Sequence, residues 1–208
     1  MTAEEPRSIE GARAATPESL GRAIAQGIED GIALMRRHEL RHQLQEFTDT
    51  TERYEAGEDV VPGDCWRAAL ASLLELPLAE VPHFIHLYEQ ERDPEPELVQ
   101  LAGPWWWRET RAWVEQVRPG WTVAAWERPT DGEDWRPIYG ETAKDDPEGI
   151  PSRVILTAPS PRGAWNHSVL VFDLDGSLAH DPFPDGGGVL EGPGDVVALV
   201  RPEWLVGE

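Results

Sequence analysis

Apolar residues in the first part of the chain recur at helical spacing. From Leu20 to Tyr54 they fall three to five residues apart and form one apolar stripe, at Ile24, Ile28, Ile32, Met35 and Leu40. A small polar residue followed by proline, Thr16-Pro17, is typical of a helix start. We therefore predict a long amphipathic helix here. Residues 1–16 show no such period and are predicted to be a mobile tail.

Two further helices are predicted from their patterns and the breakers that flank them. A turn-forming cluster at residues 61–64 precedes a segment, Cys65 to about Leu76, that is apolar on most sides and ends at Pro77. A helix that is apolar on most sides is buried. A tryptophan-rich helix is predicted over residues 105–117, between Pro104 and a Pro-Gly pair.

Beyond residue 120 the period changes to that of strands. Five are predicted, over residues 121–126, 153–158, 166–173, 177–180 and 196–201, with a polar loop over 127–150. Helices followed by strands indicate an α+β fold with an antiparallel sheet. We divide the chain into the tail (1–16), a helical accessory arm (17–59) and an α+β domain (60–208).

Composition narrows the class of protein. The 208 residues are 40% hydrophobic, with ten tryptophans, which is enough for one core. A net charge of −21 disfavours binding to nucleic acids or anionic membranes. The N-terminus lacks the features of a signal peptide, and no apolar run has membrane-spanning length. A single cysteine fits a reducing compartment, so we expect a cytoplasmic location. The use of arginine over lysine, with Lys144 the one lysine, suggests a bacterial or phage genome rich in GC.

The position of Cys65 suggests a nucleophile. It opens a buried helix directly after a break, where unpaired backbone N–H groups and a partial positive charge stabilise a thiolate. The same N–H groups can form an oxyanion hole. The alternative is that Cys65 is a small buried apolar residue.

His167 and Asp181 are the predicted partners of Cys65. His167 stands at the mouth of an apolar strand, where its ring would be held firmly as a general base requires. The chain turns through residues 173–176 and returns to Asp181-Pro182. A three-residue bulged loop would pair Val169 with Asp181 and bring the carboxylate diagonally beside His167. A two-residue loop would place Asp181 on the opposite face, where it would be only a turn residue.

At these residues the chain resembles a known family. The segment GDCWRAALASLLELPLAEVPHF, residues 63–84, is similar to the nucleophile segment of papain-like cysteine peptidases and amidases, mostly uncharacterised proteins of phages and actinobacteria. A C-terminal block is similar too, through Ser160-Pro161-Arg162-Gly163, Asn166-His167, Gly176, His180-Asp181-Pro182-Phe183-Pro184 and Gly187. The resemblance covers about residues 60–86 and 153–190.

The resemblance implies a papain-like fold and a triad of Cys65 as nucleophile, His167 as base and Asp181 as orienting residue. The family usually carries an oxyanion-binding glutamine about six residues before the cysteine, where this chain has Glu58-Asp59-Val60-Val61. We assign oxyanion stabilisation or substrate positioning to Asn166 and Trp66 instead, beside the backbone N–H of Cys65.

Three other signals in the sequence compete with the triad. His38-Glu39-Leu40-Arg41-His42 matches the zinc-protease pattern, but arginines flank it and no third ligand follows. His180 could compete as the base, although its strand position inverts its face relative to Asp181. Adjacent tryptophans at 105–107 point in different directions on a helix, so core packing or a partner surface is favoured over a shared pocket.

We therefore expect a thiol-dependent acyl-transfer enzyme of the peptidase, amidase or deamidase kind, acting on a protein, peptide or amide without a cofactor or metal. The accessory arm could bind a protein partner. The main alternative is a non-catalytic interaction module on a papain-like scaffold, which the missing glutamine favours. A zinc hydrolase using His38 and His42 is a distant third.

Overall fold

The computed structural model describes residues 17–47, 53, 56–58, 63–88, 93–128, 135–139, 153–172 and 177–201. Contacts within the chain divide it into two compact units, Met1–His38 and Glu39–Glu208. The predicted tail, residues 1–16, lies outside the described residues.

The first unit is built on helix α1, Pro17–Leu40. Three residues of its predicted apolar stripe are exposed: Ile28 is 58%, Ile32 42% and Met35 61% accessible. The helix ends well before Tyr54, where the sequence pattern placed its end. Beyond Leu40 the chain belongs to the second unit and bonds within it, where the Gln43 backbone N–H donates to Ser72 Oγ at 2.9 Å. The two compact units meet at residues 38/39, whereas the sequence pattern placed the end of the arm at residue 59.

The helices of the second unit follow the sequence pattern closely. Helix α3 spans Cys65–Leu74 and α6 spans Trp105–Val117. Helix α3 ends at Glu75, whose backbone is left-handed (φ 54°) and whose N–H bonds back to the last turn. The shorter helices are η1 (Leu78–Glu80), α4 (Phe84–Tyr88), η2 (Pro96–Leu98) and α5 (Val99–Ala102).

Six strands form one antiparallel sheet in the order β2-β1-β6-β3-β4-β5. They are β1 (Thr122–Glu127), β2 (Arg136–Pro137), β3 (Val154–Pro159), β4 (Asn166–Val171), β5 (Leu178–His180) and β6 (Asp195–Val200). Five of them lie where the sequence predicted strands. The sixth, β2, is a two-residue strand inside the predicted 127–150 loop, of which residues 129–134 and 140–150 are outside the described ranges.

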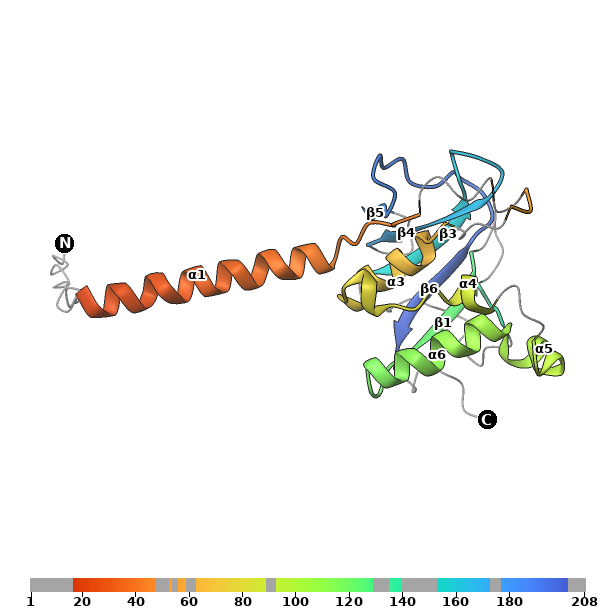
Figure 1. Ribbon diagram of the computed structural model, residues 1–208, viewed down its shortest axis with the longest axis horizontal. Coiled ribbons are helices and arrows are strands. Elements are labelled where there is room, and N and C mark those ends of the chain that lie inside the picture. Colours follow the sequence, from red (N-terminus) through yellow and green to blue (C-terminus); the bar gives the residue numbers. More distant parts are fainter. Residues whose placement is uncertain are drawn as a thin grey trace, which may run out of the picture. The chain divides into compact units, whose positions relative to one another are not determined.

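The sheet has an apolar cluster on each face because apolar side chains alternate along its strands. Val123 and Ala125 of β1 belong to the cluster that includes α3 and α6, whereas Ala124 and Trp126 belong to the other. Helix α3 packs on β4 and β3, and α6 packs on β1 (Figure 1). This packing sets the first turn of α3 close to the start of β4.

The α+β class with an antiparallel sheet is confirmed by these elements. In the described part of the chain, no single helix has both the length and the apolar character to cross a membrane. One pair, Cys65–Leu74 with Leu78–Tyr88, passes the same test jointly but is bent by 103°.

Candidate active site

Cys65 is the first residue of α3, as the sequence predicted, and its side chain is partly exposed. The preceding residue, Asp64, is completely buried but does not cap the helix with its side chain. Its carboxylate instead accepts the backbone N–H of Phe47 at 3.0 Å and pairs with Arg67 at 3.4 Å. The first backbone N–H groups of α3, which have no partner within the helix, are therefore left for another acceptor.

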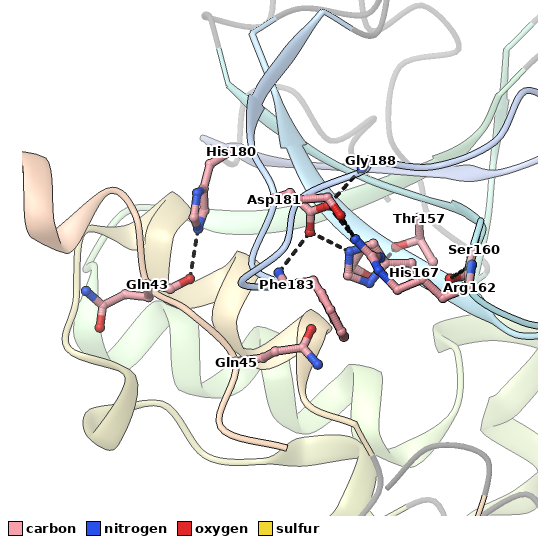
Figure 2. A network of polar contacts seen from close by, with 12 residues as sticks. Gln43, Gln45, Thr157, Ser160, Arg162, His167, His180, Asp181, Phe183 and Gly188 are labelled. Carbon is pink, nitrogen blue, oxygen red and sulfur yellow. Dashed lines mark hydrogen bonds and ion pairs between the residues drawn. The ribbon is translucent and has the colours of Figure 1, made fainter. Parts of the chain in front are cut away.

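His167 and Asp181 come together from two strands of the sheet. His167 is the second residue of β4, and Asp181 follows the last residue of β5. His167 Nε2 lies 2.7 Å from Asp181 Oδ1, and both side chains are only 4% exposed (Figure 2). A bond at Nε2 leaves Nδ1 as the ring nitrogen free to serve the thiol.

Cys65 also interacts with the His167 ring. Burial, the strongest influence, would lower the pKa of His167, but the hydrogen bonds and charges of Asp181 and Cys65 outweigh it and raise that pKa from 6.5 to about 9. The three residues predicted as a triad are thus coupled through one ring. The raised pKa favours the charged form of the ring.

Asp181 is held as a carboxylate by four donors. Besides His167, the backbone N–H groups of Phe183 and Gly188 donate to it at 2.8 Å each, and Arg162 Nη2 lies 3.1 Å away. Burial acts to raise the pKa of Asp181, but the bonds from His167 and the two backbone groups lower it to about 2. A carboxylate with every bond satisfied stays ionised and fixes the orientation of the ring.

The loop after Asp181 is shaped for this task. Gly188 has φ 65°, a left-handed conformation that side chains disfavour, and it turns its N–H toward the carboxylate. Arg162 also bonds to the Gly186 carbonyl and stacks 4.0 Å above the Phe183 ring. Arg162 therefore stabilises the loop that follows Asp181.

The hairpin ladder stops one pair short of Val169 and Asp181, the pair that the bulged alternative expects. Leu170 pairs with His180, so that continuation of the ladder would bring Val169 opposite Asp181. The irregularity lies between Leu170 and Val171, and Val171 pairs with Leu178. The bulge is thus in the strand, whereas the turn residues 173–176 are outside the described ranges.

Asn166 and Trp66, the predicted positioning residues, line one cavity of about 190 Å³. Each is the chain neighbour of a triad residue, but neither touches His167 through an observed hydrogen bond. Trp106 and Trp107 line the same cavity, and Trp105 packs on Tyr88 at a centroid distance of 4.7 Å. Two of the three adjacent tryptophans thus line this cavity and Trp105 does not, in keeping with the expectation that all three cannot face one pocket.

The competing histidines lie elsewhere. His180 Nε2 is 2.9 Å from the Gln43 carbonyl oxygen, and burial lowers the pKa of His180 (Figure 2). Helix α1 ends at Leu40, so His42 is not on a helical face with His38, as a zinc-protease helix requires. No group of three or more metal-ligating side chains occurs among the residues that the structure describes.

Gln45 is a residue that the sequence reasoning did not select. It is 8% exposed, and its backbone N–H donates to the carbonyl of Pro182, the residue after Asp181. Its side-chain Nε2 donates to the Phe47 carbonyl at 3.0 Å, and its Oε1 is buried without a partner among the described residues. A glutamine therefore lies beside the site although the chain has none close before Cys65, and no local pattern in the sequence marks it.

The arrangement combines a thiol at a helix N-terminus with a charged imidazole that a buried carboxylate orients. Such a set can hold a thiolate and then move a proton, which are the two requirements of nucleophilic catalysis by cysteine. Comparison with known proteins adds no assignment: no family model, curated protein or solved structure matches the chain.

Proposed function

We propose that this protein is a thiol-dependent acyl-transfer enzyme on a papain-like fold, in which Cys65 is the nucleophile, His167 the proton carrier and Asp181 the orienting residue. The observation that carries the proposal is the coupling of Cys65 and Asp181 through one buried ring, with His167 Nε2 bonded to Asp181 at 2.7 Å. The partly exposed thiol supports access by a substrate. A single cysteine suits a reducing cytoplasm.

The reaction follows from these groups. The Cys65 thiolate attacks the carbonyl carbon of an amide, peptide or ester, and the new C–S bond leaves negative charge on the carbonyl oxygen. His167, charged at neutral pH, gives its proton to the leaving group as the bond to carbon breaks. Water or another acceptor then attacks the thioester while His167 takes up the proton, and Cys65 is regenerated.

The carbonyl oxygen needs donors while it is negative. The backbone N–H groups at the start of α3 are the first candidates, because the Asp64 side chain does not cap them. Gln45 is a second candidate, since an amide nitrogen has two N–H bonds and one of them is committed to Phe47. Gln45 could thus replace the glutamine that the papain-like family usually carries shortly before its cysteine.

Alkylation of Cys65 tests the proposal directly, because it is the one cysteine in the chain. We expect iodoacetamide to label the native protein near pH 6.5 at least about tenfold faster than it labels glutathione, and His167→Gln to remove this advantage. A native rate no faster than that of glutathione would contradict the proposal.

Acyl transfer itself is tested with 4-nitrophenyl acetate. The wild-type protein should release nitrophenolate in a burst and gain one acetyl group on Cys65, as seen by mass spectrometry, whereas Cys65→Ala should do neither. A reactive thiol that never becomes acylated would favour the alternative, a non-catalytic module on the same scaffold.

A further inference from the structure

The cavity beside the triad has the composition of a cation-binding site. Four aromatic side chains, Trp66, Trp106, Trp107 and Tyr139, contribute to its wall. The Trp106 ring stands nearly perpendicular to the other three, at interplanar angles of 76°, 78° and 81° and centroid distances of 5.8–5.9 Å. Rings at these angles and distances pack edge to face, and ring faces that border a cavity can receive an organic cation.

One acidic side chain faces this aromatic wall. Asp195, the first residue of β6, lies opposite Thr157 in the sheet and lines the cavity with it. It is the one formally charged side chain among the described lining residues. Its negative charge acts on Tyr139, whose pKa burial and that charge together raise to about 12, so the two side chains are close and the phenol stays neutral.

The Asp195 carboxylate lacks a cationic partner within the described part of the chain. No ion pair or side-chain hydrogen bond joins it to another described residue, and burial raises its pKa above the ordinary value, with a further contribution from the charge of Glu127. A half-buried carboxylate without a partner is costly, and a bound cation would offset that cost.

A second polar group in the same wall also lacks a partner. The Trp66 side chain is 94% buried, since 6% of its surface is accessible, and its indole Nε1 has no hydrogen-bond partner among the described residues. A ligand that carries both a carbonyl oxygen and a cation could satisfy the indole and the carboxylate together.

The cavity adjoins the reacting groups without containing them. Trp66 follows Cys65 and Asn166 precedes His167, so the chain neighbours of both the nucleophile and the base form part of its lining. Pockets for drug-sized ligands measure about 300–1,000 Å³, and a cavity of about 190 Å³ suits a single side chain instead.

We infer that this cavity is a specificity subsite for a basic side chain, so that the substrate carries a lysine-like ammonium or arginine-like guanidinium group next to the bond that reacts. The inference rests on the proposed function in treating the occupant as part of the acyl substrate. The cation would meet the faces of the aromatic rings and the Asp195 carboxylate, and the net charge of −21 would attract such a substrate.

Calorimetric titration of full-length Cys65→Ala protein tests the inference without any need for catalysis. The ligands are the Nα-acetyl methylamides of lysine, arginine, norleucine and glutamate, which share a backbone and differ in charge. We expect lysine and arginine to bind about tenfold or more tightly than norleucine, and glutamate to bind more weakly still.

Two variants and a control test whether the lysine derivative binds in this cavity. Asp195→Asn should remove most of the preference for lysine over norleucine, and Trp106→Leu should weaken lysine binding by about threefold or more. Glu115→Gln, an exposed position on α6, removes the same charge elsewhere and should change nothing. The comparison of ligands on the unaltered cavity decides the question even if a variant does not fold.

The inference is overturned if norleucine binds as tightly as lysine, if no ligand binds, or if Asp195→Asn keeps the full preference. Failure of the proposed function looks different: Cys65 would be unreactive while the lysine and arginine derivatives still bind.

Discussion

His167 is a residue whose protonation is set by what lies on either side of its ring. Burial opposes the charged form of the ring, but the hydrogen bonds and charges of Asp181 and Cys65 outweigh it. These interactions would raise the pKa of His167 much less if the site were open to water, because charge interactions weaken in water. The chemistry of the site therefore depends on a carboxylate that the Arg162–Phe183 pair and two backbone groups keep in place.

Stability should depend on pH through the same pair. The folded-state pKa of His167, about 9, lies above its ordinary 6.5, so its stabilisation is complete below pH 6.5 and lost as pH rises through 9. The pKa of Asp181, about 2, lies below its ordinary 3.8, so its contribution is complete above pH 3.8 and lost as pH falls through 2. The pair therefore stabilises most between pH 3.8 and 6.5.

Thermal unfolding of the wild type and of His167→Gln at about pH 6 and about pH 9.5 measures this effect. The wild type should lose about 5 °C more than the variant over that interval. Equal losses in the two proteins would show that His167 does not carry the pH dependence.

Asp181→Asn should impair the thiol chemistry more than it impairs folding. Asparagine cannot hold the charged ring as a carboxylate does, so we expect the iodoacetamide labelling rate of Cys65 near pH 6.5 to fall about ten- to a hundredfold. Asp185→Asn, an exposed aspartate in the same loop, is the matched control and should label at the wild-type rate. Labelling of Asp181→Asn at that rate would remove Asp181 from the site.

Gln45 is expected to influence acylation but not alkylation. Gln45→Ala should slow acetylation of Cys65 by 4-nitrophenyl acetate about tenfold or more, because an oxyanion forms only in that reaction. Its iodoacetamide rate should stay within about twofold of the wild-type value, since alkylation creates no oxyanion. If both rates fell together, Gln45 would hold the structure around Cys65 and not the oxyanion.

At the scale of elements, the sequence was most informative where a local signal settles the outcome. Pro104 before α6 and the Pro-Gly-Asp cluster before Cys65 marked helix starts that the structure confirms to the residue. The end of α1 was missed because Gln43 and Gln45 are held by residues far along the chain, and no local pattern encodes those partners. The inclusion of Gln45 in the site was missed for the same reason.

Buried and exposed helices should respond differently to truncation of a side chain. Leu70 on α3 is completely buried, so Leu70→Ala should lower the free energy of unfolding of the second unit by about 3 kcal/mol. Ile28→Ala on α1, at a position 58% exposed, should change it by less than about 0.5 kcal/mol.

Urea unfolding followed by tryptophan fluorescence measures both variants, because all ten tryptophans lie in the second unit. A large loss in Ile28→Ala would mean that α1 contributes to the core of that unit in solution.

At the scale of the whole molecule, the arm and the domain divide at residues 38/39. A chain that begins at Glu39 should therefore unfold cooperatively and label at Cys65 within about twofold of the full-length rate. A chain that begins at Val60 loses the residues that bond to Ser72, Asp64 and the Pro182 carbonyl, and it should be less stable by about 2 kcal/mol or more. Circular dichroism and labelling on both truncations check this, and equal stability of the two would place the boundary at 59/60 after all.

The outermost strands of the sheet are also its shortest. β2 has two residues, one of them proline, and β5 has three, whereas the four strands between them have six each. Long, flat edge strands can pair with the sheets of other molecules and so cause aggregation. These short edge strands offer few unpaired backbone groups for such growth, so we expect the protein to resist assembly through the edges of its sheet.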